Sequence, residues 1–221
     1  MELYEKLLYF DIETAGKYET LQDFKNEDSR GAALFIKRCE KNKKKWPDKP
    51  CDELYLEKCA LLPEYGQIIC VSLAYYSNGD LKRATYSGDE ITIISKIIDI
   101  LTNIHKKGLA LCGFNIKGFD NSWLIKKFFQ YDLGIPSCLD LMNKKPWELK
   151  IYDLSEIWRA GYFNYPTLDE VSWALGINSP KQILSGDKVH ETYWNGGIET
   201  IKKYCEADVQ CLVDIAKKIM K

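Results

Sequence analysis

The stretch Leu7–Gly16, "LLYFDIETAG", joins four consecutive large apolar residues to two acids. An uninterrupted apolar run of this kind is typical of a strand that is covered on both faces. Side chains two positions apart in a strand point to the same side, so Asp11 and Glu13 would stand next to each other. Buried carboxylates without compensation are rare. The two acids therefore either cap loop amides at an exposed strand end or form one side of a site that compensates their charges.

Length and composition favour a globular chain of one sizeable domain. The 221 residues predict a single domain over 1–221, with residues 17–63 as an insertion. A net charge of −1 gives no general attraction to polyanions, so any nucleic-acid binding would need a local patch. The chain contains no apolar run long enough to span a membrane, and its start, "MELYEKLLYF", lacks the features of a signal peptide. We expect a cytoplasmic protein.

The eight cysteines fit that expectation, because none forms a CxxC pair and only two histidines are present. A metal site formed by Cys39, Cys51 and Cys59 is disfavoured, and reduced, mostly buried thiols are expected instead. We expect His105 and His190 to be surface or structural residues.

Strand and helix patterns predict an α/β fold. The run 67–88 has Asn78-Gly79 between two β-rich halves, a strong hairpin signal, so the first three strands should form an antiparallel meander. A helix over 88–108 follows, with Asp89 as its N-cap and Ile91, Ile94, Ile98 and Leu101 as its apolar stripe. The remaining segments alternate as strand 109–115, helix 119–130, strand 148–154, a helix over 168–175 with a capping box, and a last helix over 196–221. The predicted sheet is mixed, with three antiparallel strands then two parallel ones, flanked by helices.

Two further acids lie in these later elements, one at the start of a helix and one inside the last helix. Asp120 starts the helix after the strand that ends at Asn115, and ligands collect at the C-terminal ends of parallel strands. Its alternative interpretation is a helix-capping acid. Asp208 lies in the last helix, one turn after Tyr204, among neighbours that look core-facing. Its alternative is an exposed acid on an amphipathic helix.

Together, the four acids indicate a metal site. No lysine or arginine is adjacent to Asp11 or Glu13 in the sequence. Clusters of carboxylates favour hard divalent cations such as Mg²⁺ or Mn²⁺. Two such ions about 4 Å apart can clamp the attacking and leaving oxygens of a phosphoryl displacement.

Three motifs make the chain resemble the DEDD 3′–5′ exonucleases of the ribonuclease-H-like fold. D-x-E is present in "FDIET", N-x(2–3)-(F/Y)-D in "NIKGFD" and Y-x3-D in "YCEAD". The run "PEYGQIICVSLAY" is also similar to the second strand of proofreading domains in family B DNA polymerases. The resemblance is to stand-alone predicted exonucleases related to those domains, found often in phages and bacteria. It covers almost the whole chain and is least secure over 17–63, and Lys203 in place of histidine indicates the tyrosine (DEDDy) subtype.

The resemblance implies a two-metal 3′–5′ exonuclease that releases nucleoside 5′-monophosphates from single-stranded DNA. It assigns catalysis to Asp11, Glu13, Asp120, Tyr204 and Asp208. Asp11 would bridge two Mg²⁺ or Mn²⁺ ions, Glu13 and Asp208 would complete the shell of one, and Asp120 would bind through water, while Tyr204 would hold the attacking water. The Thr14 backbone, Asn115 and Phe119 would line the seat of the terminal nucleotide. The implied partners are a nucleic-acid 3′ end and candidate proteins of replication or repair, with no membrane.

Several alternatives stay open at this point. The same chemistry would serve an RNA-trimming exoribonuclease, because no motif reads the 2′-hydroxyl. A catalytically silent nucleic-acid-binding module and an endonuclease of the ribonuclease H kind fit less well. The predicted insertion is helical and basic, with a cationic run over 37–49 that contains Trp46. This run either follows a phosphate backbone or is simply a solvated helix end. Asp153 is interpreted as structural.

Overall fold

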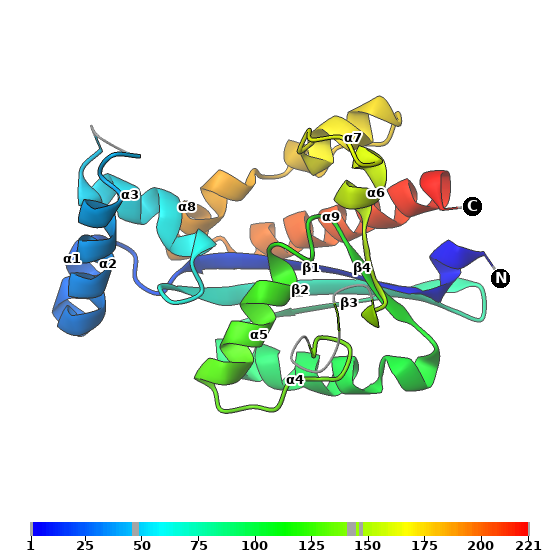
Figure 1. The fold of residues 1–221 in the computed structure, drawn as a ribbon, viewed down its shortest axis with the longest axis horizontal. Coiled ribbons are helices and arrows are strands. Elements are labelled where there is room, and N and C mark those ends of the chain that lie inside the picture. The colour runs from blue at the N-terminus through cyan, green and yellow to red at the C-terminus, as the bar shows by residue number, and fades with distance from the viewer. Residues whose placement is uncertain (1, 46–48, 141–144, 146–147, 221) are drawn as a thin grey trace.

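A five-stranded mixed sheet forms the centre of the computed structural model, which describes residues 2–45, 49–140, 145 and 148–220 (Figure 1). The strand order is β3-β2-β1-β4-β5. The strands are β1 (Leu7–Gly16), β2 (Gly66–Ser77), β3 (Asp80–Ser87), β4 (Ala110–Gly113) and β5 (Ile151–Asp153).

The pairing of the strands confirms the predicted α/β arrangement. β1 and β2 are antiparallel, as are β2 and β3, whereas β4 runs parallel to both β1 and β5. Asn78 and Gly79 join β2 to β3 with positive φ angles of 54° and 84°, as a type I′ hairpin turn requires. This mixed sheet is the one expected for a ribonuclease-H-like fold.

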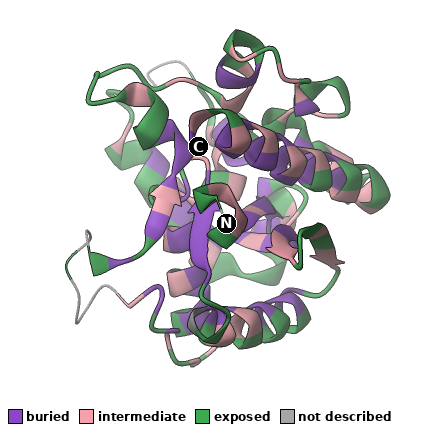
Figure 2. Ribbon diagram, turned by 90° about the vertical axis from the view of Figure 1, so that its right-hand side faces the viewer, coloured by how far each residue is buried: buried purple, intermediate pink, exposed green. Residues whose placement is uncertain are grey.

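Helices cover both faces of the sheet. α4 (Glu90–Asn103) and α5 (Asp120–Gln130) lie on one face, and α9 (Ile198–Ile219) lies on the other with α6, α7 and α8 (Figure 1). Leu8, Phe10 and Ile12 pack into the core on the α4 and α5 side, while Leu7 and Tyr9 pack against α9. Asp11 and Glu13 continue the second set, so their side chains face the α9 side. Buried residues follow the strands and the inner sides of the helices (Figure 2).

The shorter elements complete the chain. α6 is Leu154–Arg159, α7 is Leu168–Ala174 and α8 is Val189–Trp194. Short 3-10 helices lie at Leu3–Lys6, Cys59–Leu61, His105–Lys107, Pro180–Gln182 and Gly186–Lys188. The predicted capping box of α7 is present, with Thr167 and Glu170 as its partners. Within the described residues, no helix combines the length and apolar character that a membrane span requires.

The buried face of α4 differs from the prediction. Asp89 caps the helix as expected, but the buried isoleucines are Ile93, Ile94 and Ile97. Ile91 is 39% exposed, so the predicted stripe was wrong there. Isoleucines occupy so many positions of α4 that two stripes satisfy helical spacing. The buried carboxylate of Glu90 selects the observed one, because positions three, four and seven residues after it turn to the same side.

The connection between β1 and β2 forms three helices at one end of the sheet (Figure 1). They are α1 (Leu21–Glu27), α2 (Ser29–Lys41) and α3 (Cys51–Lys58). They pack around their own cluster, in which rings of Phe24, Phe35, Tyr55 and Tyr65 meet edge to face. α2 ends at Lys41, inside the cationic run over 37–49, and residues 46–48 of that run lie outside the described residues. That residues 17–63 are an insertion in a single domain stays a prediction.

Thiol and histidine side chains have structural surroundings. The eight cysteines carry thiols rather than disulfides, and seven of them are buried. Among the described residues, Cys39, Cys51 and Cys59 form no group with the spacing of metal ligands. His190 is buried, accepts a hydrogen bond from the Gly16 amide at 3.0 Å and contacts the Glu19 carbonyl at 2.9 Å. The side chain of His105 is outside the described part of the chain.

Candidate active site

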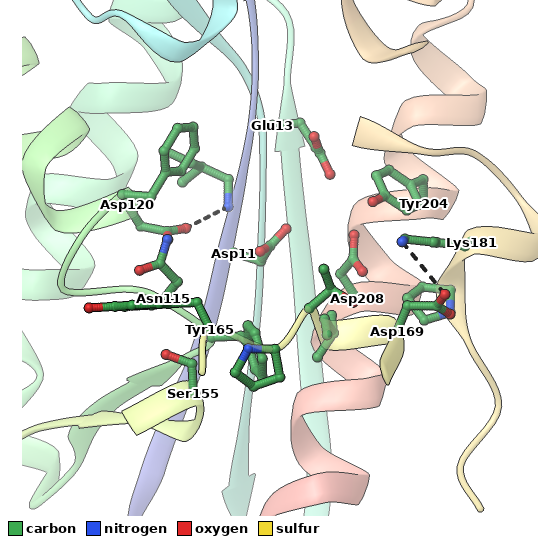
Figure 3. Close-up of a pocket in the computed structure, with 17 residues that line it drawn as sticks. Asp11, Glu13, Asn115, Asp120, Ser155, Tyr165, Asp169, Lys181, Tyr204 and Asp208 are labelled. Carbon is green, nitrogen blue, oxygen red and sulfur yellow. Dashed lines mark hydrogen bonds and ion pairs between the residues drawn. The ribbon is translucent and has the colours of Figure 1, made fainter. Parts of the chain in front are cut away.

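A cavity of about 440 Å³ opens beside β1, between the start of α5 and the middle of α9. Figure 3 shows side chains from these elements directed into it. Seven of the eight residues predicted from the sequence line this cavity: Asp11, Glu13, Asn115, Phe119, Asp120, Tyr204 and Asp208. The structure thus brings together residues that are almost the full length of the chain apart.

β1 delivers two of the acids to the same side. Asp11 pairs with Ser72 and Glu13 with Cys70, and the register then shifts between Glu13 and Thr14. The unpaired residue is Ile69 on β2, so β1 keeps its alternation and Thr14 faces the side opposite to Asp11 and Glu13. Thr14 is the predicted residue that does not line the cavity. Its hydroxyl donates to the Ala60 carbonyl at 2.6 Å, in the connection between β1 and β2.

The turn between β4 and α5 positions Asn115 and Asp120. Asn115 has a φ of 54°, and its backbone amide donates to the Asp153 carboxylate at 2.8 Å. The same carboxylate accepts from the Lys117 backbone amide at 3.2 Å. A side chain at Gly118 would lie 2.6 Å from the Asn115 side-chain oxygen, so a larger residue there would displace the Asn115 side chain. Asp120 then accepts a hydrogen bond from the Ile12 amide at 3.1 Å. Asp153 organises the turn that holds Asp120 against β1.

α9 supplies Tyr204 and Asp208 one turn apart, as their spacing predicts. Both are buried, with exposed fractions of 8% and 5%. Between them, Cys205 contacts Asp11: its thiol lies 3.5 Å from a carboxylate oxygen and 3.6 Å from the carbonyl oxygen. The long helix therefore closes the site from the face opposite α5.

Burial raises the pKa values of all four acids, and repulsion between neighbouring acids adds to it for Asp11, Glu13 and Asp120. The pKa of Asp11 is raised by burial and then by repulsion from Asp208, Glu13 and Asp120. Burial, followed by Asp208, raises the pKa of Glu13. Burial raises the pKa of Asp120 to about 8, against the hydrogen bonds it accepts from backbone amides, and that of Asp208 to about 7, against Tyr204 and Lys181. The site carries more negative charge than its own surroundings compensate.

This donor set fits a hard divalent cation. Ligand atoms of Asp11, Glu13 and Cys205 all lie within 4.8 Å of one another. Burial raises the pKa of the Cys205 thiol well above its ordinary value, and hard cations prefer oxygen to sulfur, so we expect this thiol to donate a hydrogen bond instead of binding the metal. The carboxylate oxygens that remain are the donors preferred by Mg²⁺ and Mn²⁺.

Sequence reasoning missed several residues around the cavity. Lys181 lies beside Asp208 (Figure 3) and forms an ion pair of 3.5 Å with Asp169, which also lines the cavity. Tyr165 and Ser155 contribute to its wall. These residues come from loops and helix starts between β5 and α8, where no periodic pattern marked them. A buried carboxylate cluster in need of a cation was the one signal that could have prompted a search for Lys181.

The basic run 37–49 lies elsewhere. Its described basic residues, including Lys37, Arg38 and Lys41, are exposed, and none of them lines the cavity. Lys49 forms an ion pair with Glu57. Trp46 lies outside the described residues. A role of this run in nucleic-acid binding stays a prediction.

A mixed sheet with helices on both faces and a carboxylate cavity beside its central strand defines the ribonuclease-H-like class of fold. Comparison with family models places the chain more closely. Residues 62–211 match the predicted 3′–5′ exonucleases related to the exonuclease domain of PolB, and the chain belongs to this family. The match includes Asn115, Asp120, Tyr204 and Asp208, and it begins after β1 and its two acids. No curated protein matches the chain.

Proposed function

We propose that the protein is a two-metal-dependent 3′–5′ exonuclease of the tyrosine subtype. It removes nucleoside 5′-monophosphates one at a time from the 3′ ends of single-stranded DNA. The observation that carries this proposal is the convergence of four carboxylates with raised pKa values on one cavity, in a chain of an exonuclease family.

Asp11, Glu13, Asp120 and Asp208 would hold two Mg²⁺ or Mn²⁺ ions. Such ions neutralise charge on the scissile phosphate, lower the pKa of the attacking water and orient both. The fit rests on the chemistry of the donors. Four buried acids repel one another, and this repulsion is relieved when cations bind between them.

The remaining groups of the cavity orient the substrate. Burial and the surrounding acids raise the pKa of Tyr204, so its hydroxyl stays protonated and can hold the attacking water by a hydrogen bond. Asn115 and Phe119 flank the entrance on the α5 side and would contact the terminal nucleotide, together with the backbone at Thr14. Lys181 brings a positive charge to the opposite side, where the phosphate would lie.

The test uses a 5′-labelled single-stranded DNA and the matching RNA, each with Mg²⁺ or Mn²⁺. We expect a ladder that shortens from the 3′ end of the DNA and is blocked by a 3′-phosphate. Asp208→Asn and Asp11→Ala should each slow it by at least about 10³-fold, because a metal ligand contributes several kcal/mol of charge stabilisation.

The matched control is Asp214→Asn, on the same helix but outside the cavity, which should retain wild-type rates. Degradation of the RNA alone would establish the exoribonuclease instead. Cleavage of a circular single strand would indicate an endonuclease, and wild-type protein without activity on either polymer would refute the proposal.

A further inference from the structure

The four most exposed large apolar side chains among the described residues lie close together in the sequence, and one of them, Tyr165, lines the cavity. Tyr162, Phe163, Tyr165 and Trp173 are 73%, 90%, 76% and 81% exposed, and the next, Phe129, is 58% exposed. We call these four residues the aromatic shelf. Aromatic side chains of this size are usually at least half-buried, so a group left in water marks a binding surface.

The backbone holds the shelf away from the core. α6 ends at Arg159, and Ala160 and Gly161 follow with φ angles of 48° and 84°. The Tyr162 amide donates to the Arg159 carbonyl at 2.8 Å, which closes this left-handed turn. A left-handed conformation is unfavourable for alanine. At the other end, the capping box of Thr167 and Glu170 fixes the start of α7. The exposed loop is therefore anchored at both ends.

The shelf continues directly from the candidate active site. Tyr165 lines the cavity, as does Asp169 in the first turn of α7 (Figure 3). Trp173 follows Asp169 by four residues, so it lies one turn farther along the same side of the helix. The Arg159 guanidinium stacks on the Tyr165 ring, 4.3 Å from its centroid. A nucleic-acid strand that leaves the cavity on this side would contact the aromatic shelf and the Arg159 guanidinium.

We propose that the aromatic shelf stacks the unpaired bases of the strand whose 3′ end enters the cavity. This inference rests on the proposed exonuclease function and names the contacts that hold its substrate. Every base presents a flat face to an aromatic ring, so such stacking is independent of sequence. Arg159 and Lys181 stand at the cavity side of the shelf and can meet phosphates, whereas the loop 160–166, "AGYFNYP", carries no charge of its own. The described basic residues of 37–49 do not line the cavity, whereas Tyr165 of the shelf does.

The experiment measures binding of fluorescein-labelled 12-mers of deoxythymidine and of uridine by anisotropy. It uses Mg²⁺ and an Asp208→Asn background, so that binding is measured without hydrolysis. We expect Phe163→Ala and Trp173→Ala each to raise Kd about tenfold, the loss that removal of one stacking ring produces. Phe163→Leu should bind as weakly as Phe163→Ala, because it also lacks the ring. Phe163→Tyr keeps a ring and should have the Kd of the Asp208→Asn protein. Phe129→Ala, an exposed ring on α5, is the matched control and should leave Kd unchanged.

An unchanged Kd in Phe163→Ala and Trp173→Ala would overturn the inference. So would a shift from dimer to monomer in sedimentation with unchanged nucleic-acid affinity, because the shelf would then be a contact between two copies. The proposed exonuclease function is tested separately, with wild-type protein, Mn²⁺ and the small chromogenic diester p-nitrophenyl thymidine 5′-phosphate. A chain that hydrolyses neither this ester nor an oligonucleotide refutes that function, while the Kd values still decide whether the shelf binds a strand.

Discussion

At the scale of single residues, Tyr204 is the group whose surroundings define its chemistry most narrowly. Its hydroxyl is buried among Asp208, Glu13 and Asp11, and all of these raise its pKa. It therefore acts as a neutral hydrogen-bonding group and not as a base. We expect Tyr204→Phe to lower kcat about 10²-fold with little change in KM, because it removes the hydroxyl that would hold the attacking water and keeps the ring.

Steady-state degradation of the 5′-labelled strand at varied concentrations measures kcat and KM, and single-turnover degradation measures the chemical step. Tyr193→Phe is the control, because that tyrosine is half-buried on α8 and does not line the cavity. A kcat of Tyr204→Phe within twofold of the wild type would exclude a role of the hydroxyl in the reaction.

Lys181 acts on the acids by its charge. Its ammonium lowers the pKa of Asp208, which burial raises to about 7. In Lys181→Gln this pKa should rise, so the acidic limb of the profile of kcat/KM against pH should move to higher pH. Lys181→Arg should restore the wild-type profile in part, and Lys188→Gln, an exposed neighbour paired with Glu191, should not move it. A lower kcat/KM at every pH, with no shift of the acidic limb along the pH axis, would contradict this role.

The spacing of residues in the sequence was sufficient to predict that the acids share one side of a strand or helix, but it was insufficient to predict the side chains that contact them. Asp11 and Glu13 are two apart in a strand, and Tyr204 and Asp208 are four apart in a helix, so local geometry alone places each pair on one side. Lys181 and Cys205 reach the site through tertiary packing, which no local pattern encodes. The Thr14 side chain faces away from the acids because β1 alternates, and its hydroxyl donates to the Ala60 carbonyl, while the predicted role of the Thr14 backbone stays a prediction.

At the scale of elements, a buried ion pair joins α4 and α5 to the start of β2. Lys127 is fully buried, donates to the Gly66 carbonyl at 2.6 Å and lies 3.2 Å from the Glu90 carboxylate. Glu90 also accepts from the Ile68 amide and the Tyr131 hydroxyl. This network fixes the end of β2 that pairs with β1 beyond Glu13.

Removing one partner of that pair should be costly. We expect Lys127→Met to lower the free energy of unfolding by about 3–5 kcal/mol, because it leaves the Glu90 charge buried without its cation. Urea denaturation measures the change. Lys202→Met breaks an exposed pair with Glu199 on α9 and should cost less than about 1 kcal/mol. Equal losses in the two variants would mean that burial of the pair does not matter.

The network of Glu90 and Lys127 separates the features of strands and helices that the sequence predicts from those that it does not. Strand patterns, the Asn78-Gly79 turn and the Asp89 cap are local signals, and they placed the sheet and the start of α4 correctly. The inward face of α4 depends on Glu90, which looks like a surface acid until Lys127 is known to lie opposite it. Burial of charge by a distant partner is not visible in a pattern of apolar residues.

At the scale of the whole molecule, the acidic cavity should govern the dependence of stability on pH. The folded-state pKa values of Asp120 and Asp208, about 8 and 7, lie above those of the unfolded chain. A raised pKa contributes stability that is complete below the unfolded value of about 4 and is lost as pH rises through the folded value. Without divalent ions, we therefore expect the Tm of the wild type to fall from pH 5 to pH 8 relative to the Tm of the double variant Asp120→Asn/Asp208→Asn, which lacks these two ionisable groups.

Mg²⁺ or Mn²⁺ should reverse this loss, because a ligand that binds only the folded state raises Tm. The increase should be largest at pH 8, where the acids are ionised, and absent in the double variant. Differential scanning calorimetry with and without EDTA measures both effects. An equal increase in the double variant would place the bound ions elsewhere on the protein.

The distance along the chain between the two sides of the cavity also determines when it can exist. Asp11 and Cys205 touch although 194 positions separate them, because β1 is among the first elements of the chain and α9 is the last. A nascent chain on the ribosome exposes the two acids of β1 long before the helix that carries Tyr204 and Asp208 emerges. The acidic cavity is therefore complete only once synthesis has passed α9 and this helix has docked. For the proposed nuclease, chains that stop or are cleaved before α9 lack Tyr204 and Asp208, so we expect activity only from chains that include this helix and have folded.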